Sequence, residues 1–157
     1  MKSLVVYYSR TGNAKFVAET IAAELGSDIE EVVDLKSREG KLGWISAGGD
    51  ASRGKQTNIA PTTKDPSGYD LIVVGTPVWA WSPSAAIRTY LSRNNLSGKK
   101  VALFLTMDSN IRQADQKIKA LMPNSTFVSE LSVAKALENK EATKQKITAW
   151  CSILKAA

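Results

Sequence analysis

The residues with the clearest chemical potential form a short polar loop, Ser9-Arg-Thr-Gly-Asn13, near the start of the chain. The apolar run Leu4–Tyr8 before this loop predicts a buried strand, and apolar residues after it recur at helical spacing as far as Leu25. The N-terminus of a helix offers unpaired backbone N–H groups and a partial positive charge, and both attract a phosphate group. Hydroxyl and amide side chains add hydrogen-bond donors, and glycine lets the backbone come close to a ligand. The loop therefore predicts a phosphate-binding site.

The same loop also fits an ordinary connection between a strand and a capped helix, because serine, threonine and asparagine are common helix caps. Two nucleotide-binding motifs are excluded. The loop lacks the three spaced glycines of a dinucleotide fingerprint and the Gly-Lys-Ser/Thr sequence of nucleoside triphosphatases. From these residues alone, the phosphate site and the plain helix cap both stay open.

The amino-acid composition removes several kinds of chemistry. The chain has 157 residues, which suits a single domain spanning residues 1–157, and it contains no histidine. Histidine-based nucleophile relays, general bases and metal ligands are therefore excluded. The single cysteine, Cys151, rules out an intrachain disulfide bond and a cysteine-ligated cluster. Chemistry at neutral pH would come from a bound cofactor or from a carboxylate with a shifted pKa.

The formal net charge is +6, and much of the excess lies in one segment. Residues 35–64 contain six basic and two acidic residues, a net charge of +4. No tight run of lysine and arginine occurs, so nucleic acid is not expected as a partner. No apolar run is long enough to span a membrane, and no signal peptide is recognisable, so we expect a cytoplasmic protein.

Apolar runs and helical periodicities alternate along the chain. Residues 36–68 interrupt the alternation as a long irregular insertion, in which residues 41–52 allow a short helix. The expected strands are Leu4–Tyr8, Asp28–Leu35, Tyr69–Gly75, Lys100–Thr106 and Phe127–Val133. The expected helices are Ala14–Leu25, one that is capped by Ser82 and begins at Pro83, Ser109–Met122, and one from about Asn139. The alternation predicts an α/β fold with a parallel sheet and helices on both faces.

Three loops with unusual content leave the carboxyl ends of the predicted strands, at residues 9–14, 76–81 and 106–110. In an open parallel sheet, ligands bind at this edge, where the strand order reverses. The second loop contains Trp79 and Trp81, and alternate residues of an extended segment point the same way. Either tryptophan could instead pack into the core. Together, the loops suit a ligand with one phosphate and a flat ring.

Two of these stretches resemble motifs of the flavodoxin family. The loop at residues 9–13 after a first strand is similar to the flavodoxin phosphate loop, and Asp70–Trp79 is similar to the third strand and the loop that packs on the flavin ring. The resemblance covers essentially the whole chain. It implies a flavodoxin-like three-layer α/β sandwich whose five-stranded parallel sheet has the order 2-1-3-4-5, the order for which flavodoxin is the standard example, with FMN (flavin mononucleotide) between strands 1 and 3.

The resemblance also implies which residues bind FMN. By position, the phosphate would be held by Ser9, Arg10, Thr11, Gly12, Asn13 and Ala14. The flavin ring would be lined by Thr76, Pro77, Val78, Trp79, Ala80 and Trp81, with Trp79 as the main stacking partner. The pyrimidine end would meet Thr106, Met107, Asp108 and Ser109. No catalytic side chain and no metal ligand are implied.

This chain departs from the flavodoxin pattern at three points. Ala14 stands where the family usually has threonine, which removes one phosphate hydroxyl. The third loop lacks the Gly-Gly pair or aromatic residue often found there, so Met107 is expected to cover the second ring face. The net charge is positive, whereas flavodoxins are typically acidic.

Two functions follow from the resemblance. The first is a low-potential electron-transfer protein that cycles FMN between quinone, semiquinone and hydroquinone and meets redox partner proteins transiently, as a monomer or weak dimer. Its basic surface would favour partners with an acidic face. The second is an FMN-dependent oxidoreductase that acts on a quinone or porphyrin-type substrate, with residues 36–68 and Trp44 as a flap or as a solvated insertion. A flavin-free phosphoacceptor domain is excluded, because Gly75-Thr76 stands where its aspartate would be.

Overall fold

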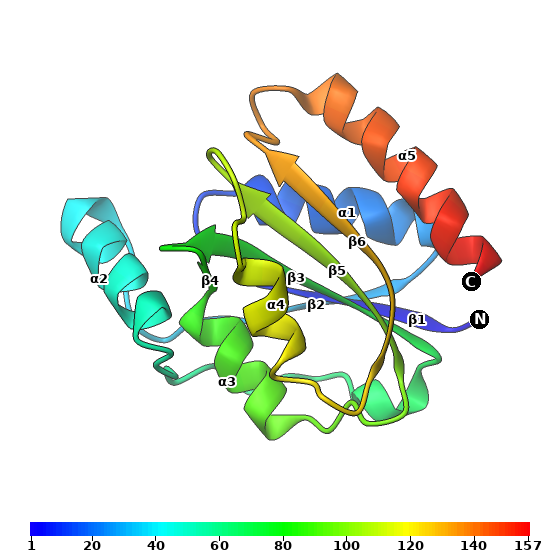
Figure 1. Cartoon of the computed structure of the whole chain (residues 1–157), viewed down its shortest axis with the longest axis horizontal. Helices are drawn as coiled ribbons and strands as arrows, with labels where there is room; N and C mark the ends of the chain where they lie inside the picture. The colour runs from blue at the N-terminus through cyan, green and yellow to red at the C-terminus, as the bar shows by residue number, and fades with distance from the viewer.

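A computed structural model describes residues 1–157 as one parallel sheet flanked by helices (Figure 1). The sheet runs in the order β2-β1-β3-β5-β6, and all of these strands are parallel. The short strand β4 pairs antiparallel with β3, outside this path. With β4 left out, the predicted order 2-1-3-4-5 is confirmed. The strands are β1 (Ser3–Tyr7), β2 (Asp28–Glu31), β3 (Leu71–Trp79), β4 (Ser82–Pro83), β5 (Lys100–Met107) and β6 (Thr126–Ala134).

Helices cover both faces of the sheet and form two separate cores (Figure 1). Residues of β1 alternate between these cores. Leu4 and Val6 pack on the side of α3 (Ala85–Arg93) and α4 (Ala114–Lys119), whereas Val5 and Tyr7 pack on the side of α1 (Asn13–Leu25) and α5 (Lys140–Ala156). Burial on both faces explains why these strands are apolar without alternation. The predicted α/β three-layer arrangement is confirmed.

The segment between β2 and β3 contains more structure than an irregular insertion. Helix α2 (Gly40–Ser52) confirms the short helix that residues 41–52 allow, and a 3-10 turn, Pro66–Gly68, precedes β3. Strand β2 ends at Glu31 and not at Leu35 as predicted, because Asp34 instead pairs with Ile59 in an isolated antiparallel bridge. No helix in the chain is both long and apolar enough to cross a membrane.

Two of the predicted helices have wrong bounds. Ser82 and Pro83 do not start a helix, because they pair with Trp79 and Val78 in the β3–β4 hairpin. The cap of α3 is Ser84, whose Oγ accepts a hydrogen bond from the Ile87 N–H. Helix α4 is limited to Ala114–Lys119, whereas Ser109–Met122 was expected. Arg112 has a φ of 45°, which a right-handed helix cannot contain, so the helix begins only after it.

Gly75 lies in the buried part of β3, opposite Tyr7 of β1. A Cβ atom at this position would overlap the buried ring of Phe104 on β5. Gly75→Ala is therefore expected to destabilise the fold by about 1–3 kcal/mol, the usual cost of overpacking a core. Urea unfolding of this variant should be compared with that of Gly68→Ala, whose Cβ would meet no atom within 4 Å. Equal midpoints for the two variants would contradict the expected overlap.

Candidate functional site

The loop between β1 and α1 lies at the C-terminal ends of the strands and presents backbone N–H groups that have no hydrogen-bond acceptor. The Gly12 N–H donates to the Ser9 Oγ at 3.1 Å, and the Gly12 carbonyl accepts from Phe16 at 3.0 Å. The next three backbone N–H groups, of Asn13, Ala14 and Lys15, have no acceptor, and no side chain caps the helix. A plain helix cap would occupy one of these groups. The arrangement thus favours an anion cradle over a capped connection.

Asn13 and Thr11 shape the rim of this cradle. The Asn13 Nδ2 donates to the Thr11 Oγ1 at 3.1 Å, while the Asn13 Oδ1 accepts from the Leu137 N–H at 3.0 Å. Asn13 therefore joins the loop to the segment between β6 and α5. Gly12 has a φ of 96°, in the left-handed region that disfavours other residues, so the tight turn requires glycine.

Arg10 points toward α2 and not into the cradle. Its Nε donates to the Arg38 carbonyl at 2.6 Å, and its Nη2 donates to the Gly40 carbonyl at 3.1 Å. These carbonyls lie directly at the start of α2. Arg10 therefore connects the polar loop to α2.

The β3–β4 hairpin carries the two tryptophans of the second loop. Ala80 and Trp81 form its two-residue turn with φ values of 47° and 55°, a conformation usually adopted by Asn-Gly. The half-buried Trp79 meets the Tyr8 ring edge-on, with centroids 5.6 Å apart. Trp81 is 47% exposed, and the Arg112 guanidinium lies 4.3 Å from its ring centroid. A strained turn of this kind is typical of a functional site.

A cavity of about 300 Å³ lies between the hairpin, the loop after β5 and α2. It brings together members of the second and third predicted loops, although the tryptophans reach it through a turn and not from one extended segment. Its walls are mostly aromatic and apolar, and Asp108 is the one charged side chain among them. The lining residues are Trp44, Gly48, Val78, Trp79, Ala80, Trp81, Met107, Asp108, Ser109 and Asn110.

Among the residues predicted to contact the ring, Thr76, Pro77 and Thr106 do not line the cavity. Thr76 is fully buried, and its Oγ1 accepts the Ser84 N–H at 3.0 Å, which joins β3 to the start of α3. Thr106 is buried in β5, where it pairs with Pro77 of β3 and Val133 of β6. Their contacts are therefore with the backbone that carries the hairpin and the third loop.

Trp44 lines the cavity but is not among the FMN-binding residues predicted from the sequence, which placed it only in a possible flap or insertion. It is 61% exposed and also borders a neighbouring hollow that contains Arg10, Lys41 and Ile45. Helix α2 lies against β3, β4 and α3, and its buried positions are the small residues Gly43, Ala47 and Ala51. A tryptophan in a short glycine-rich helix was the available signal, but only the tertiary fold shows that it faces the cavity.

A buried charge cluster holds the start of α2 in place. Arg38, whose side chain is 3% exposed, donates from Nε to Asp34 at 3.0 Å and from Nη1 to Asp50 at 2.6 Å. Lys36 also donates to Asp50, at 2.9 Å. The hydrogen bond from Lys36 and the contacts with Arg38 outweigh partial burial and lower the pKa of Asp50. Burial raises the pKa of Tyr8, beside Trp79, to about 12, so its phenol stays neutral.

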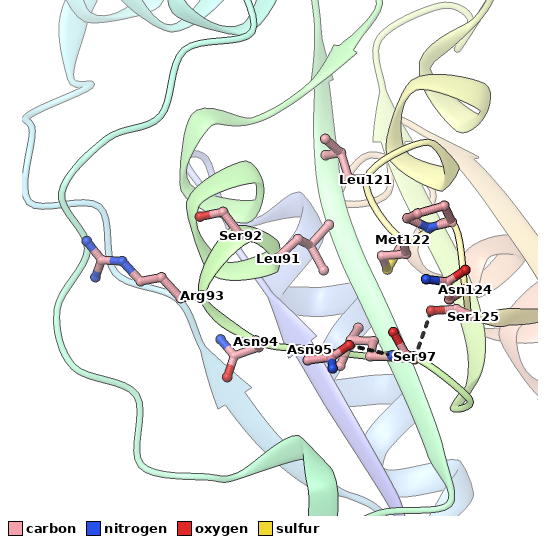
Figure 2. Close-up of a pocket in the computed structure, with 12 residues that line it drawn as sticks. Leu91, Ser92, Arg93, Asn94, Asn95, Ser97, Leu121, Met122, Asn124 and Ser125 are labelled. Carbon is pink, nitrogen blue, oxygen red and sulfur yellow. Dashed lines mark hydrogen bonds between the residues drawn. The ribbon is translucent and has the colours of Figure 1, made fainter.

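A second hollow, of about 340 Å³, lies at the opposite edge of the sheet (Figure 2). It is bounded by the C-terminal part of α3 and by the loops that precede β5 and β6. Its lining contains no aromatic residue, and its one charged side chain, Arg93, extends away from the other lining residues in Figure 2. This hollow therefore lacks the groups expected of a site for a phosphate or a flat ring.

Comparison with known proteins identifies the family of this chain and solved structures with the same fold. A family model described as flavodoxin matches residues 2–154. A comparison with curated proteins gave no match. A flavoprotein from Lactobacillus acidophilus NCFM, crystallised in complex with FMN, is 24% identical with a TM-score of 0.74, over 87% of this chain and 96% of that one.

Two further solved structures share the architecture. A flavoprotein from Bacteroides uniformis is 24% identical with a TM-score of 0.76, over 93% of this chain and 97% of that one. A flavodoxin from Streptococcus pneumoniae TIGR4 is 16% identical with a TM-score of 0.64, over 99% of both chains. At these identities, the structural likeness shows a shared fold.

Proposed function

This chain belongs to the flavodoxin family, and from that premise we propose that it binds FMN and serves as a low-potential, one-electron carrier between redox partner proteins. One observation carries the proposal: an anion cradle and an aromatic cavity lie at the same carboxyl edge of the sheet. The FMN-bound relative from Lactobacillus acidophilus supports the choice of cofactor.

The residues present fit both parts of FMN. Backbone N–H groups of residues 13–15, with the Thr11 hydroxyl and the Asn13 amide, would hold the phosphate. Backbone donors do not depend on the side chain, so Ala14 still supplies an N–H despite lacking the family's hydroxyl. The ring would lie against Trp79, Trp81 and Met107 in the cavity. When bound, FMN would supply the electron-transfer chemistry, and the protein would orient it and exclude water.

Trp44 favours a second candidate function. Because Trp44 lines the cavity from α2, this helix would cover a flat ring as a flap in an FMN-dependent oxidoreductase for a quinone or porphyrin-type substrate. Steady-state quinone reduction with NAD(P)H by the pure protein would favour this enzyme over the carrier.

The proposed cofactor and function are tested by visible absorption of the purified protein, before and after addition of FMN, followed by anaerobic stepwise reduction. A flavin spectrum and a one-electron-reduced form that accumulates would support the carrier. Direct two-electron reduction would favour the enzyme. A protein that neither contains nor takes up FMN would contradict both functions.

Asp108 lines the cavity, so its negative charge would disfavour a negative charge on the reduced flavin ring. Asp108 is therefore expected to lower the reduction potential of bound FMN. Asp108→Asn should raise the potential of the final one-electron step by on the order of tens of millivolts, since a partly exposed charge is screened. A spectroelectrochemical titration measures this. Asp70→Asn is the control, because it makes the same change just before the N-terminal end of β3, at the opposite end of the strands from the cavity. An unchanged or lower potential for Asp108→Asn would refute the expectation.

A further inference from the structure

Helix α2 presents large apolar side chains to solvent. Its buried positions are the small residues Gly43, Ala47 and Ala51, and the helical repeat places Leu42 and Ile45 on the opposite side. Leu42 is 83% exposed and Ile45 is 61% exposed. We call Lys41, Leu42 and Ile45 the α2 face. Figure 1 shows α2 at the margin of the molecule, with its outer side turned away from the other helices. An exposed apolar group of this kind marks a contact surface.

The α2 face adjoins the candidate FMN site through one side chain. Trp44 lines the cavity and also borders the hollow that contains Lys41 and Ile45. A protein bound to the α2 face would therefore lie beside the same tryptophan that lines the cavity. This adjacency suits electron transfer between a bound partner and a ring in the cavity.

Charges around the α2 face are mostly positive. Lys41 lies on it and Arg10 borders the neighbouring hollow, while Arg53 and Lys55 are exposed at the far end of the helix. Of the two acidic residues nearby, Asp50 is already bound by two cations, and Glu39 is exposed just before the helix. A partner with acidic groups around its contact region would be attracted and oriented by this charge distribution.

The apolar part of the α2 face is short, which favours a protein over a lipid surface. The large apolar residues end at Ile45, and the following turns of α2 contain Gly48, Gly49 and Asp50. A helix that lies on a membrane needs an apolar stripe along its length. A single turn with an adjacent tryptophan, surrounded by polar residues, is typical of a protein hot spot.

We propose that the α2 face is the docking surface for a redox partner protein whose own contact region is apolar and ringed by carboxylates. The proposal rests on the proposed carrier function. Hydrogen bonds from Arg10 and ion pairs of Arg38 attach the start of α2 to the rest of the chain. A small contact of this kind suits a transient encounter, because electron-transfer interfaces lie at the low end of the size range.

The test uses the FMN-loaded, ¹⁵N-labelled protein and an acidic plant-type [2Fe–2S] ferredoxin as the probe. Amide shift changes should map to residues 40–53 and to the β3–β4 hairpin, and they should diminish as salt is added. The double variant Leu42→Ser/Ile45→Ser should bind the ferredoxin at least tenfold more weakly. Ile153→Ser, which changes another exposed apolar residue on α5, should bind it as the unmodified protein does.

Each other outcome overturns the docking proposal. Shift changes that map away from α2, equal affinity of the double variant, or no binding at low salt would each do so. Sedimentation with phosphatidylglycerol vesicles that is lost in the double variant would indicate a membrane surface instead. The absorption spectrum of the same samples reports FMN separately, and thermal unfolding reports folding. Failure of cofactor binding is thereby distinguished from failure of docking.

Discussion

Thr11→Asp is expected to weaken FMN binding by roughly 100-fold and to leave riboflavin binding almost unchanged. Thr11 is exposed at the rim of the cradle, beside the free N–H groups of residues 13–15. A carboxylate there would lie close to the proposed phosphate. Like charges about 4 Å apart repel by about 4 kcal/mol at the effective dielectric constant of a protein surface, and salt reduces this to roughly 3 kcal/mol. Riboflavin has no phosphate, so it escapes this repulsion.

Flavin fluorescence titrations with FMN and with riboflavin measure the two affinities. Thr11→Asn is the matched control, because it has nearly the same shape as aspartate and no charge. It should change either affinity by only a few fold. Equal losses for FMN and riboflavin with Thr11→Asp would indicate a distorted site, and no loss for FMN would place the phosphate away from this loop.

The parts of the fold that the sequence predicts well depend on local patterns. The apolar runs of β1 and β3 are recognisable because both faces of the sheet are covered, so consecutive residues from Leu4 to Tyr7 and from Leu71 to Val74 are apolar. The polar loop at residues 9–13 follows directly from the break between a strand pattern and a helix pattern. Parallel strands then place all three loops at the carboxyl ends of the strands, which explains why residues of the second and third loops share one cavity.

The parts that the sequence does not predict depend on contacts between distant residues. Ala80-Trp81 lacks the Asn-Gly chemistry of a hairpin turn, so the pairing of Ser82 with Trp79 overrides the local preference for a capped helix. Helix α2 has four glycines in thirteen residues, a composition that disfavours a helix. It is held by ion pairs between Arg38 and both Asp34 and Asp50, which no local pattern reveals.

Acidification is expected to loosen α2 through the same charge cluster. The pKa of Asp50 is lowered in the folded chain, chiefly by the Lys36 hydrogen bond. A lowered pKa means that the contribution of Asp50 to stability is present above the unfolded value of about 3.9 and is lost as the pH falls through the folded value. The protection factors of residues 40–52, which compare observed exchange with the intrinsic rate at the same pH, should therefore fall below a pH of about 4, before those of the sheet strands do.

Arg38→Met is expected to release α2 without unfolding the sheet. The variant leaves Asp34, whose side chain is 3% exposed, without its cation. A broken buried pair costs about 3–5 kcal/mol if the segment stays in place. Helix α2 buries only glycine and alanine side chains against the body, so its attachment contributes little hydrophobic energy. Because the penalty exceeds what holds the helix, detachment of α2 is the lower-energy response.

Amide exchange should then show lost protection in α2 and intact protection in α1 and α5, and FMN affinity should fall as Trp44 leaves the cavity wall. Lys36→Met is the control, because this half-exposed partner of Asp50 contributes only about 0–1 kcal/mol. Retained protection of α2 in Arg38→Met would mean that the hydrogen bonds from Arg10 to the Arg38 and Gly40 carbonyls suffice to hold it. A drop in protection throughout the sheet would instead make α2 part of the cooperative core.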